Sequence, residues 1–170
     1  MNCPNCGKEV FEDYNFCKYC GAHLDKIKAS PTITTNPLEE EVTKIIVKRL
    51  DGIRNRDEKI VNNIIDIGKY SKFDDWPPYN RQTGDEAIKN EFGAFKVLSN
   101  YNYDLKDFKA DIIGDTVIAT FLLHYSGAMR RKPFEVYSRV TTILEKHDSE
   151  WKIIHEHFSR FPQERQRRWL

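Results

Sequence analysis

The sequence has no long apolar run and no excess of charge of either sign. Its longest apolar stretches, such as VIATFLL, are too short to cross a bilayer, and no apolar signal segment precedes the first cysteine. The formal net charge of +1 excludes a polycation that would hold nucleic acid through its overall charge. We therefore expect a cytoplasmic, non-membrane protein, with 39% hydrophobic residues to build one core and a small accessory module.

Cysteine is also scarce, and all four cysteines lie within the first 20 residues. They form two Cys-x-x-Cys pairs, each followed by glycine, in CPNCG and CKYCG. Two such pairs can aim four sulfurs at one point, and a tetrahedral sulfur site suits zinc. Disulfides and a redox pair are the alternatives, but a reducing compartment and the lack of a surrounding βαβ pattern disfavour them. We expect a structural zinc bound by Cys3, Cys6, Cys17 and Cys20.

Residues 1–24 resemble the short zinc ribbons at the N-termini of many prokaryotic proteins. The resemblance rests on the cysteine spacing, on FC before the third cysteine and on CGAHL after the fourth. It implies a small module whose folding energy comes from metal binding, and such ribbons dock proteins, bind nucleic acid or cap a terminus. Its lysines are outnumbered by acidic residues, which argues against phosphate binding as its main task.

A polar segment with a proline, residues 25–36, is typical of a linker to a second domain at 37–161. Apolar residues at helical spacing predict three helices, in NPLEEEVTKIIVKRLDG, RDEKIVNNIIDIG and TGDEAIKNEFGAFKVL. We expect Asn36 to cap the first helix, and Thr83 and Glu86 to form a capping box at the third.

Beyond the third predicted helix the apolar period changes to two. Four strands are predicted, in NYDLKDFKADIIG, DTVIATFLLHYSG, FEVYSRVTTILEK and EWKIIHEHFSRF. Helices followed by antiparallel strands predict an α+β fold, with helices packed on one face of a curved antiparallel sheet.

The end of the domain resembles a known family. The segments SRVTTILEKHDSEW and WKIIHEHFS look like the last hairpin of the SnoaL-like branch of the nuclear transport factor 2-like (NTF2-like) superfamily. They are also similar to the association domain of calcium/calmodulin-dependent kinase II, with its tryptophan, His-x-His and serine at Trp151, His155, His157 and Ser159. RDEKIVNNIID and FDDWPPYNRQTGDEAI resemble the preceding helices. The resemblance implies a cone of three helices around a bent sheet, with a pocket inside and a sheet-mediated homodimer outside.

Strand alternation places Trp151, Ile153 and the two histidines of His-x-His on one face. The residues that we predict to line a pocket are His155, His157, Arg139, His124, Tyr137 and Trp76. In a functional interpretation the histidines are acid–base groups or anion donors, Arg139 binds a carboxylate and Trp76 closes the mouth.

The structural interpretation makes the histidines hydrogen-bonded core or dimer residues and pairs Arg139 with a glutamate. A metal held by the His-x-His pair and His124 is a further alternative. Asp66, Asp74 and Asp75 are expected near the mouth, without a pattern that singles one out.

We expect a non-catalytic zinc protein, in which the ribbon contacts a partner and the cone domain dimerises and offers room for a small ligand. The alternative is an isomerase, dehydratase or cyclase that uses the pocket through His157 or His155. A weaker alternative is a nucleic-acid adaptor using the ribbon and the basic tail, residues 162–170, which is otherwise a solvated end.

Overall fold

The computed structural model describes residues 37–162. The predicted ribbon with its four cysteines, the linker at 25–36 and residues 163–170 of the basic tail lie outside the described residues. The described part of the chain contains α1 (Pro37–Asn55), α2 (Glu58–Ile64), β1 (Ser71–Phe73), β2 (Gln82–Thr83), α3 (Gly84–Phe95), β3 (Leu98–Ile113), β4 (Thr116–Met129), β5 (Lys132–His147) and β6 (Glu150–Arg160). None of these helices combines the length and the hydropathy that crossing a membrane requires.

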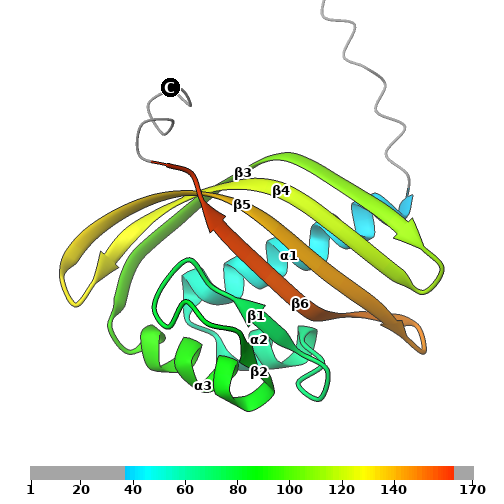
Figure 1. Ribbon diagram of the computed structural model, residues 1–170, viewed down its shortest axis with the longest axis horizontal. Coiled ribbons are helices and arrows are strands. Elements are labelled where there is room, and N and C mark those ends of the chain that lie inside the picture. Colours follow the sequence, from blue (N-terminus) through cyan, green and yellow to red (C-terminus); the bar gives the residue numbers. More distant parts are fainter. Residues whose placement is uncertain (1–36, 163–170) are drawn as a thin grey trace, which may run out of the picture. The chain divides into compact units, whose positions relative to one another are not determined.

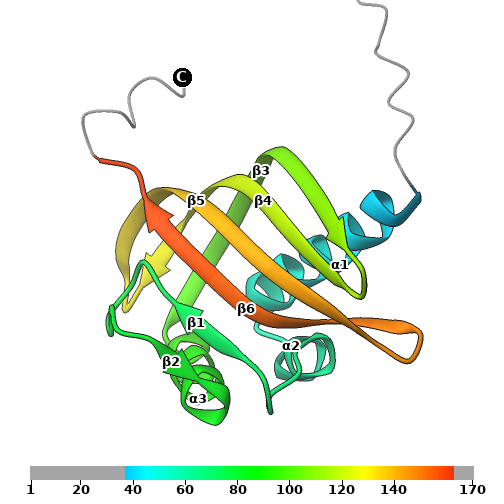
Figure 2. The same ribbon diagram turned by 45° about the vertical axis from the view of Figure 1, so that its right-hand side comes forward.

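The strands form one six-stranded sheet in the order β2-β1-β6-β5-β4-β3. Neighbouring strands are antiparallel, except that β1 runs parallel to β6. The four long strands arch over the helices, which all lie on one side of the sheet (Figures 1 and 2). The predicted α+β cone, with its three helices and four long strands, is therefore confirmed, and the aromatic segment before α3 supplies the short strands β1 and β2.

The helix α1 buries a stripe of side chains against the sheet. Val42, Ile46 and Leu50 are fully buried on this stripe, as spacing at three and four residues requires. Arg49 lies on the same stripe and is only 1% exposed. A buried guanidinium needs paired carboxylates, so α1 brings a charged group into the core together with its apolar face.

The ends of the shorter helices differ from one another. At α2 the Asp57 side chain accepts hydrogen bonds from the backbone N–H groups of Lys59 and Ile60, which is a regular N-cap. At α3 the predicted capping box is wrong, because the Thr83 side chain makes no capping hydrogen bond. Thr83 instead pairs with Ser71 as the last residue of β2.

One extra residue in β6 changes which side chains face the helices. Ile143 of β5 pairs with His155, but the next residue, Leu144, pairs with Ile153, so Ile154 is a β-bulge. Before the bulge Trp151 and Ile153 are buried on the helix side; after it, Glu156 and Phe158 take that side. The prediction that Trp151, Ile153, His155 and His157 share one face is therefore wrong, because the bulge reverses the alternation.

Candidate ligand cavity and its charged wall

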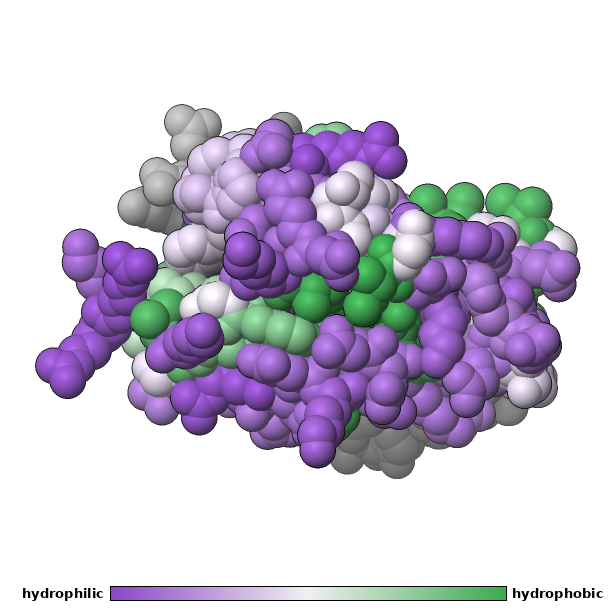
Figure 3. Space-filling model, turned by 90° about the horizontal axis from the view of Figure 1, so that it is seen from below, coloured by the Kyte–Doolittle hydropathy of each residue, from purple (hydrophilic) through white to green (hydrophobic). Residues whose placement is uncertain are grey.

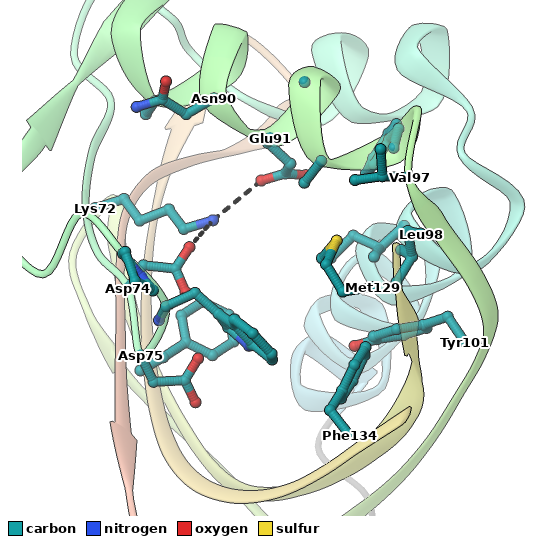
Figure 4. Close-up of a pocket in the computed structure, with 18 of the residues that line it drawn as sticks. Lys72, Asp74, Asp75, Asn90, Glu91, Val97, Leu98, Tyr101, Met129 and Phe134 are labelled. Atoms are coloured by element: carbon teal, nitrogen blue, oxygen red, sulfur yellow. Dashed lines mark hydrogen bonds and ion pairs between the residues drawn. The ribbon is translucent and has the colours of Figure 1, made fainter. Parts of the chain in front are cut away.

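A cavity of about 610 Å³ lies between α3, the segment around β1 and the helix side of the sheet. Most of its wall is apolar, and side chains from α1, α3 and the long strands contribute to it (Figure 4). Its apolar lining consists of Ile53, Trp76, Pro77, Ala87, Ala94, Phe95, Val97, Leu98, Met129, Phe134 and Phe158. Seen from below, hydrophobic residues cross the middle of the molecule between hydrophilic rims (Figure 3). The cone is therefore hollow rather than filled by its own side chains.

Buried ion pairs form one side of this cavity, centred on Arg49. The Arg49 guanidinium donates to the carboxylate of Glu91 at 2.5 and 2.6 Å and to that of Glu156 at 3.0 and 3.2 Å. The Tyr70 hydroxyl also donates to Glu156, at 2.6 Å. Burial lowers the pKa of Arg49, but the charges of Glu156 and Glu91 outweigh this effect and hold the pKa well above its ordinary value. The guanidinium therefore stays charged and fixes α1 to α3 and β6.

Lys72 extends the ion pairs to the cavity surface. Its Nζ lies 3.1 Å from Glu91 and 2.7 Å from Asp74, and Figure 4 shows it between these two carboxylates. Burial raises the pKa of Glu91, yet Arg49 and Lys72 reverse this and lower it to about 2. Burial likewise lowers the pKa of Lys72, but the charges of Glu91 and Asp74 hold it well above normal. The ammonium is therefore charged and held in place.

Asp75 carries a second, separate carboxylate into the cavity wall. Its Oδ1 accepts from the Tyr125 hydroxyl at 2.6 Å, and its Oδ2 accepts from the Ser138 hydroxyl. The indole Nε1 of Trp76 donates to the Tyr125 oxygen at 2.9 Å. Burial raises the pKa of Asp75 and outweighs the hydrogen bonds from Ser138 and Tyr125, which lower it. Asp75 therefore holds a proton up to a higher pH than an ordinary aspartate does.

A family model of the SnoaL-like domain matches residues 70–164, which is more than half of the chain. The chain belongs to the SnoaL-like family. Residues 1–25 match a second model, that of a domain of unknown function, DUF7575. A comparison with curated proteins gives no match.

Solved structures of NTF2-like proteins share this SnoaL-like fold. A candidate dehydratase of the NTF2-like family from Streptomyces avermitilis superimposes with a TM-score of 0.68 at 15% identity, covering 76% of this chain and 99% of its own. An NTF2-like superfamily protein from Salmonella enterica gives 0.68 at 20% identity, covering 76% and 94%. The CaMKII hub of S. rosetta gives 0.61 at 20% identity, covering 72% and 95%. At these identities the likeness establishes the fold.

Of the six residues predicted to line the pocket, only Trp76 lies in the cavity wall of the SnoaL-like domain. Asp74 and Asp75, expected near the mouth, also line it, whereas Asp66 does not. The carboxylate of Asp66 instead accepts from the backbone of Gly68 and lies 3.4 Å from His147.

The two histidines of the last strand lie on the outer face of the sheet. The bulge at Ile154 turns His155 and His157 away from the helices. Nδ1 of His155 shares a hydrogen bond of 2.8 Å with the Ser71 hydroxyl, and Phe73 packs on both imidazoles. Burial, with a further contribution from His157, lowers the pKa of His155.

The three other predicted residues also lie on the outer face. His124 stacks on Tyr137 at 4.2 Å and its Nε2 lies 2.9 Å from Glu135, so it does not approach the His-x-His pair. Arg139 donates to the Ser159 hydroxyl at 3.1 Å rather than to a glutamate. Their placement as cavity residues is therefore corrected, because alternation groups residues by face without telling which face the helices cover.

The sequence analysis missed most of the polar residues that do line the cavity. Lys72, Glu91, Tyr101 and Tyr125 are among them. One signal was present, since Arg49 interrupts the apolar face of the first helix and a buried arginine requires carboxylates nearby. The partners themselves come from distant segments, and nothing local marks them.

Proposed function

We propose that the SnoaL-like domain binds a small, largely apolar molecule in the cavity between α3 and the helix side of the sheet. The observation that carries this proposal is the cavity of about 610 Å³ with apolar walls and one charged side. Sites for small molecules typically have volumes of a few hundred to a thousand Å³, apolar walls and a few fixed polar groups. The Arg49 ion pairs hold Lys72 and Glu91 in position, so the site exists before a ligand arrives.

Binding can be tested with Nile red, a neutral dye that fluoresces in apolar surroundings. The protein should bind it in the cavity, and Ala94→Trp should abolish binding because the indole fills the space that Ala94 leaves on the wall. Lys89→Trp is the matched control, since Lys89 lies exposed on the same helix and away from the cavity. Equal dye binding by both variants would reject the cavity as the site.

Acid–base catalysis is the second candidate function, and Asp75 is the observation that favours it. A buried carboxyl with a raised pKa beside an apolar cavity is suited to accept a proton from a ligand. Both oxygens of Asp75 already accept hydrogen bonds, so ligand binding stands as the first role. Under this candidate, Asp75→Asn abolishes turnover of a substrate while preserving its binding; turnover unchanged by Asp75→Asn would reject it.

Two further roles belong to the same proposal. Four cysteines at zinc-ribbon spacing support a structural zinc and a docking module at residues 1–24. The outer face of the sheet supports a homodimer, because its middle carries Ile118, Leu122 and Ile143 as half-buried apolar side chains. Similar structures include hub and association domains of CaMKII, which is consistent with assembly through this domain.

The dimer is tested by light scattering at micromolar concentration. The unmodified chain should scatter as a dimer and Leu122→Arg as a monomer, because the arginine would place charge in the middle of the interface. Val47→Arg changes an exposed apolar residue on α1 and should remain dimeric. A monomer for the unmodified chain would remove the dimer from the proposal.

A further inference from the structure

Four aromatic rings gather at one side of the cavity. Trp76 meets Phe134 at 5.1 Å between ring centroids, and Tyr125 lies 6.0 Å from Phe134 and 5.8 Å from Tyr101. All four line the cavity, and Figure 4 shows Phe134 and Tyr101 across the open space from Asp75. The faces of aromatic rings carry negative charge and attract cations, most strongly where water is excluded. The rings therefore form an aromatic cage, defined by Trp76, Tyr101, Tyr125 and Phe134.

The buried charges around this cage are negative in sum. Arg49 and Lys72 are the buried cations, and each is already paired with two carboxylates. The carboxylates of Asp74, Glu91 and Glu156 outnumber them. Arg160 is exposed, stacks its guanidinium over the Trp76 ring at 4.7 Å and lies 3.9 Å from Asp75, while Arg130 is exposed at the rim. Trp76 therefore already attracts a cation of the chain itself, one that is not among the residues lining the cavity.

The hydroxyl of Tyr101 is a polar group on the cavity wall beside these rings. Tyr101 is 8% exposed, and Figure 4 shows its hydroxyl oxygen pointing into the cavity. It has no hydrogen-bond partner within the described part of the chain, in contrast to the Tyr125 hydroxyl, which is bonded to Asp75 and Trp76. The hydroxyl oxygen is open to the cavity and can accept a hydrogen bond there. A polar ligand atom beside Tyr101 can donate that bond.

We propose that the aromatic cage binds the protonated amine of an organic cation, with the Tyr101 hydroxyl accepting an N–H hydrogen bond. This inference rests on the proposed function of the cavity and adds the chemical class of its ligand. The ammonium head lies among the rings, and the apolar remainder of the ligand lies along α3, where Ala87, Ala94 and Phe95 form the wall.

Three probes of matched size test it: 2-(1-naphthyl)ethylammonium, its neutral isostere 1-propylnaphthalene, and the anion 3-(1-naphthyl)propanoate. Titration followed by naphthalene fluorescence should show the ammonium binding about 5- to 30-fold tighter than the isostere, the range expected for a desolvated cation over aromatic faces. The anion should bind most weakly. Tighter binding of 1-propylnaphthalene than of the ammonium would overturn the inference and leave the proposed function standing. Failure of all three probes and of Nile red would reject both.

Variants locate the effect in the cage. Phe134→Leu keeps an apolar side chain but removes a ring face, so it should weaken the ammonium about 5-fold and change the isostere less than about 2-fold. Tyr101→Phe removes only the hydroxyl and should weaken the ammonium about 10-fold. Met129→Leu, also in the wall, is the control and should affect both probes alike. Equal losses for both probes in Phe134→Leu and Tyr101→Phe would contradict recognition of a cation.

Discussion

Arg49 of α1 donates two hydrogen bonds to Glu156 of β6, across 107 positions of sequence. The same guanidinium donates to Glu91 of α3, so three elements meet at one buried side chain. These buried charges are stabilised only by one another. Removing any one of the three side chains would leave a buried charge without its partner and destabilise the fold. The ion pairs therefore connect the stability of the domain to the shape of its cavity.

Replacing Arg49 with methionine should destabilise the domain strongly. The change leaves Glu91 and Glu156 buried without their main partner, and breaking a buried pair in this way costs about 3–5 kcal/mol. Urea unfolding followed by circular dichroism measures the free energy of unfolding. Arg54→Met is the control, since its pair with Asp51 is partly exposed and should be worth less than about 1 kcal/mol. Similar losses for both variants would contradict the assigned importance of the buried network.

Acid should unfold the domain partly through Glu91. Its pKa is about 2 in the folded chain against an ordinary value of 4.5, so the ionised carboxylate stabilises the folded state. That contribution is fully present above pH 4.5 and is lost as the pH falls from about 4.5 towards 2. Unfolding free energies measured between pH 5 and pH 2 should fall less steeply for Glu91→Gln than for the unmodified chain. Parallel curves would show that Glu91 does not carry this dependence.

Thr142→Val should stabilise the domain. Thr142 is fully buried in β5, and its hydroxyl oxygen has no partner among the described residues. Valine has the same shape without a polar atom, so the free energy of unfolding should rise by about 1 kcal/mol. Thr141→Val, on the half-buried outer face, should change it by less than about 0.5 kcal/mol. A lower free energy of unfolding in Thr142→Val would contradict this, because it would mean that the Thr142 hydroxyl makes a hydrogen bond in the folded protein.

Elemental analysis should find about one zinc per chain, as expected for a four-cysteine site. Cys6→Ser and Cys17→Ser should each lose the metal, because one ligand from either pair is then missing. His23→Ala should retain it, since four thiolates already complete a tetrahedral shell. Zinc-free protein, or zinc kept by both serine variants, would contradict the proposal that residues 1–24 form a zinc ribbon.

The elements of this domain could be predicted from its sequence, but the inward side of its last strand could not. Helical spacing and a change of period identify three helices and four strands, because each pattern is local. A β-bulge has no comparable local signal, and the one at Ile154 reverses every residue that follows it. The charged residues of the cavity wall could not be predicted either. Glu91 is paired with Arg49 and Lys72, which come from distant segments of the chain, and no local pattern marks these pairs.

The bulge also bears on how this scaffold changes its chemistry over evolutionary time. Regular pairing of β6 with Ile154 retained would turn His155 and His157 towards the cavity and Glu156 to the outer face, whereas deleting Ile154 would remove the bulge and keep the present faces. The presence of the bulge thus decides whether a carboxylate or two imidazoles face the cavity, without any substitution. Families built on this sheet can therefore acquire a different set of reactive groups through the pairing of one strand as well as through substitution.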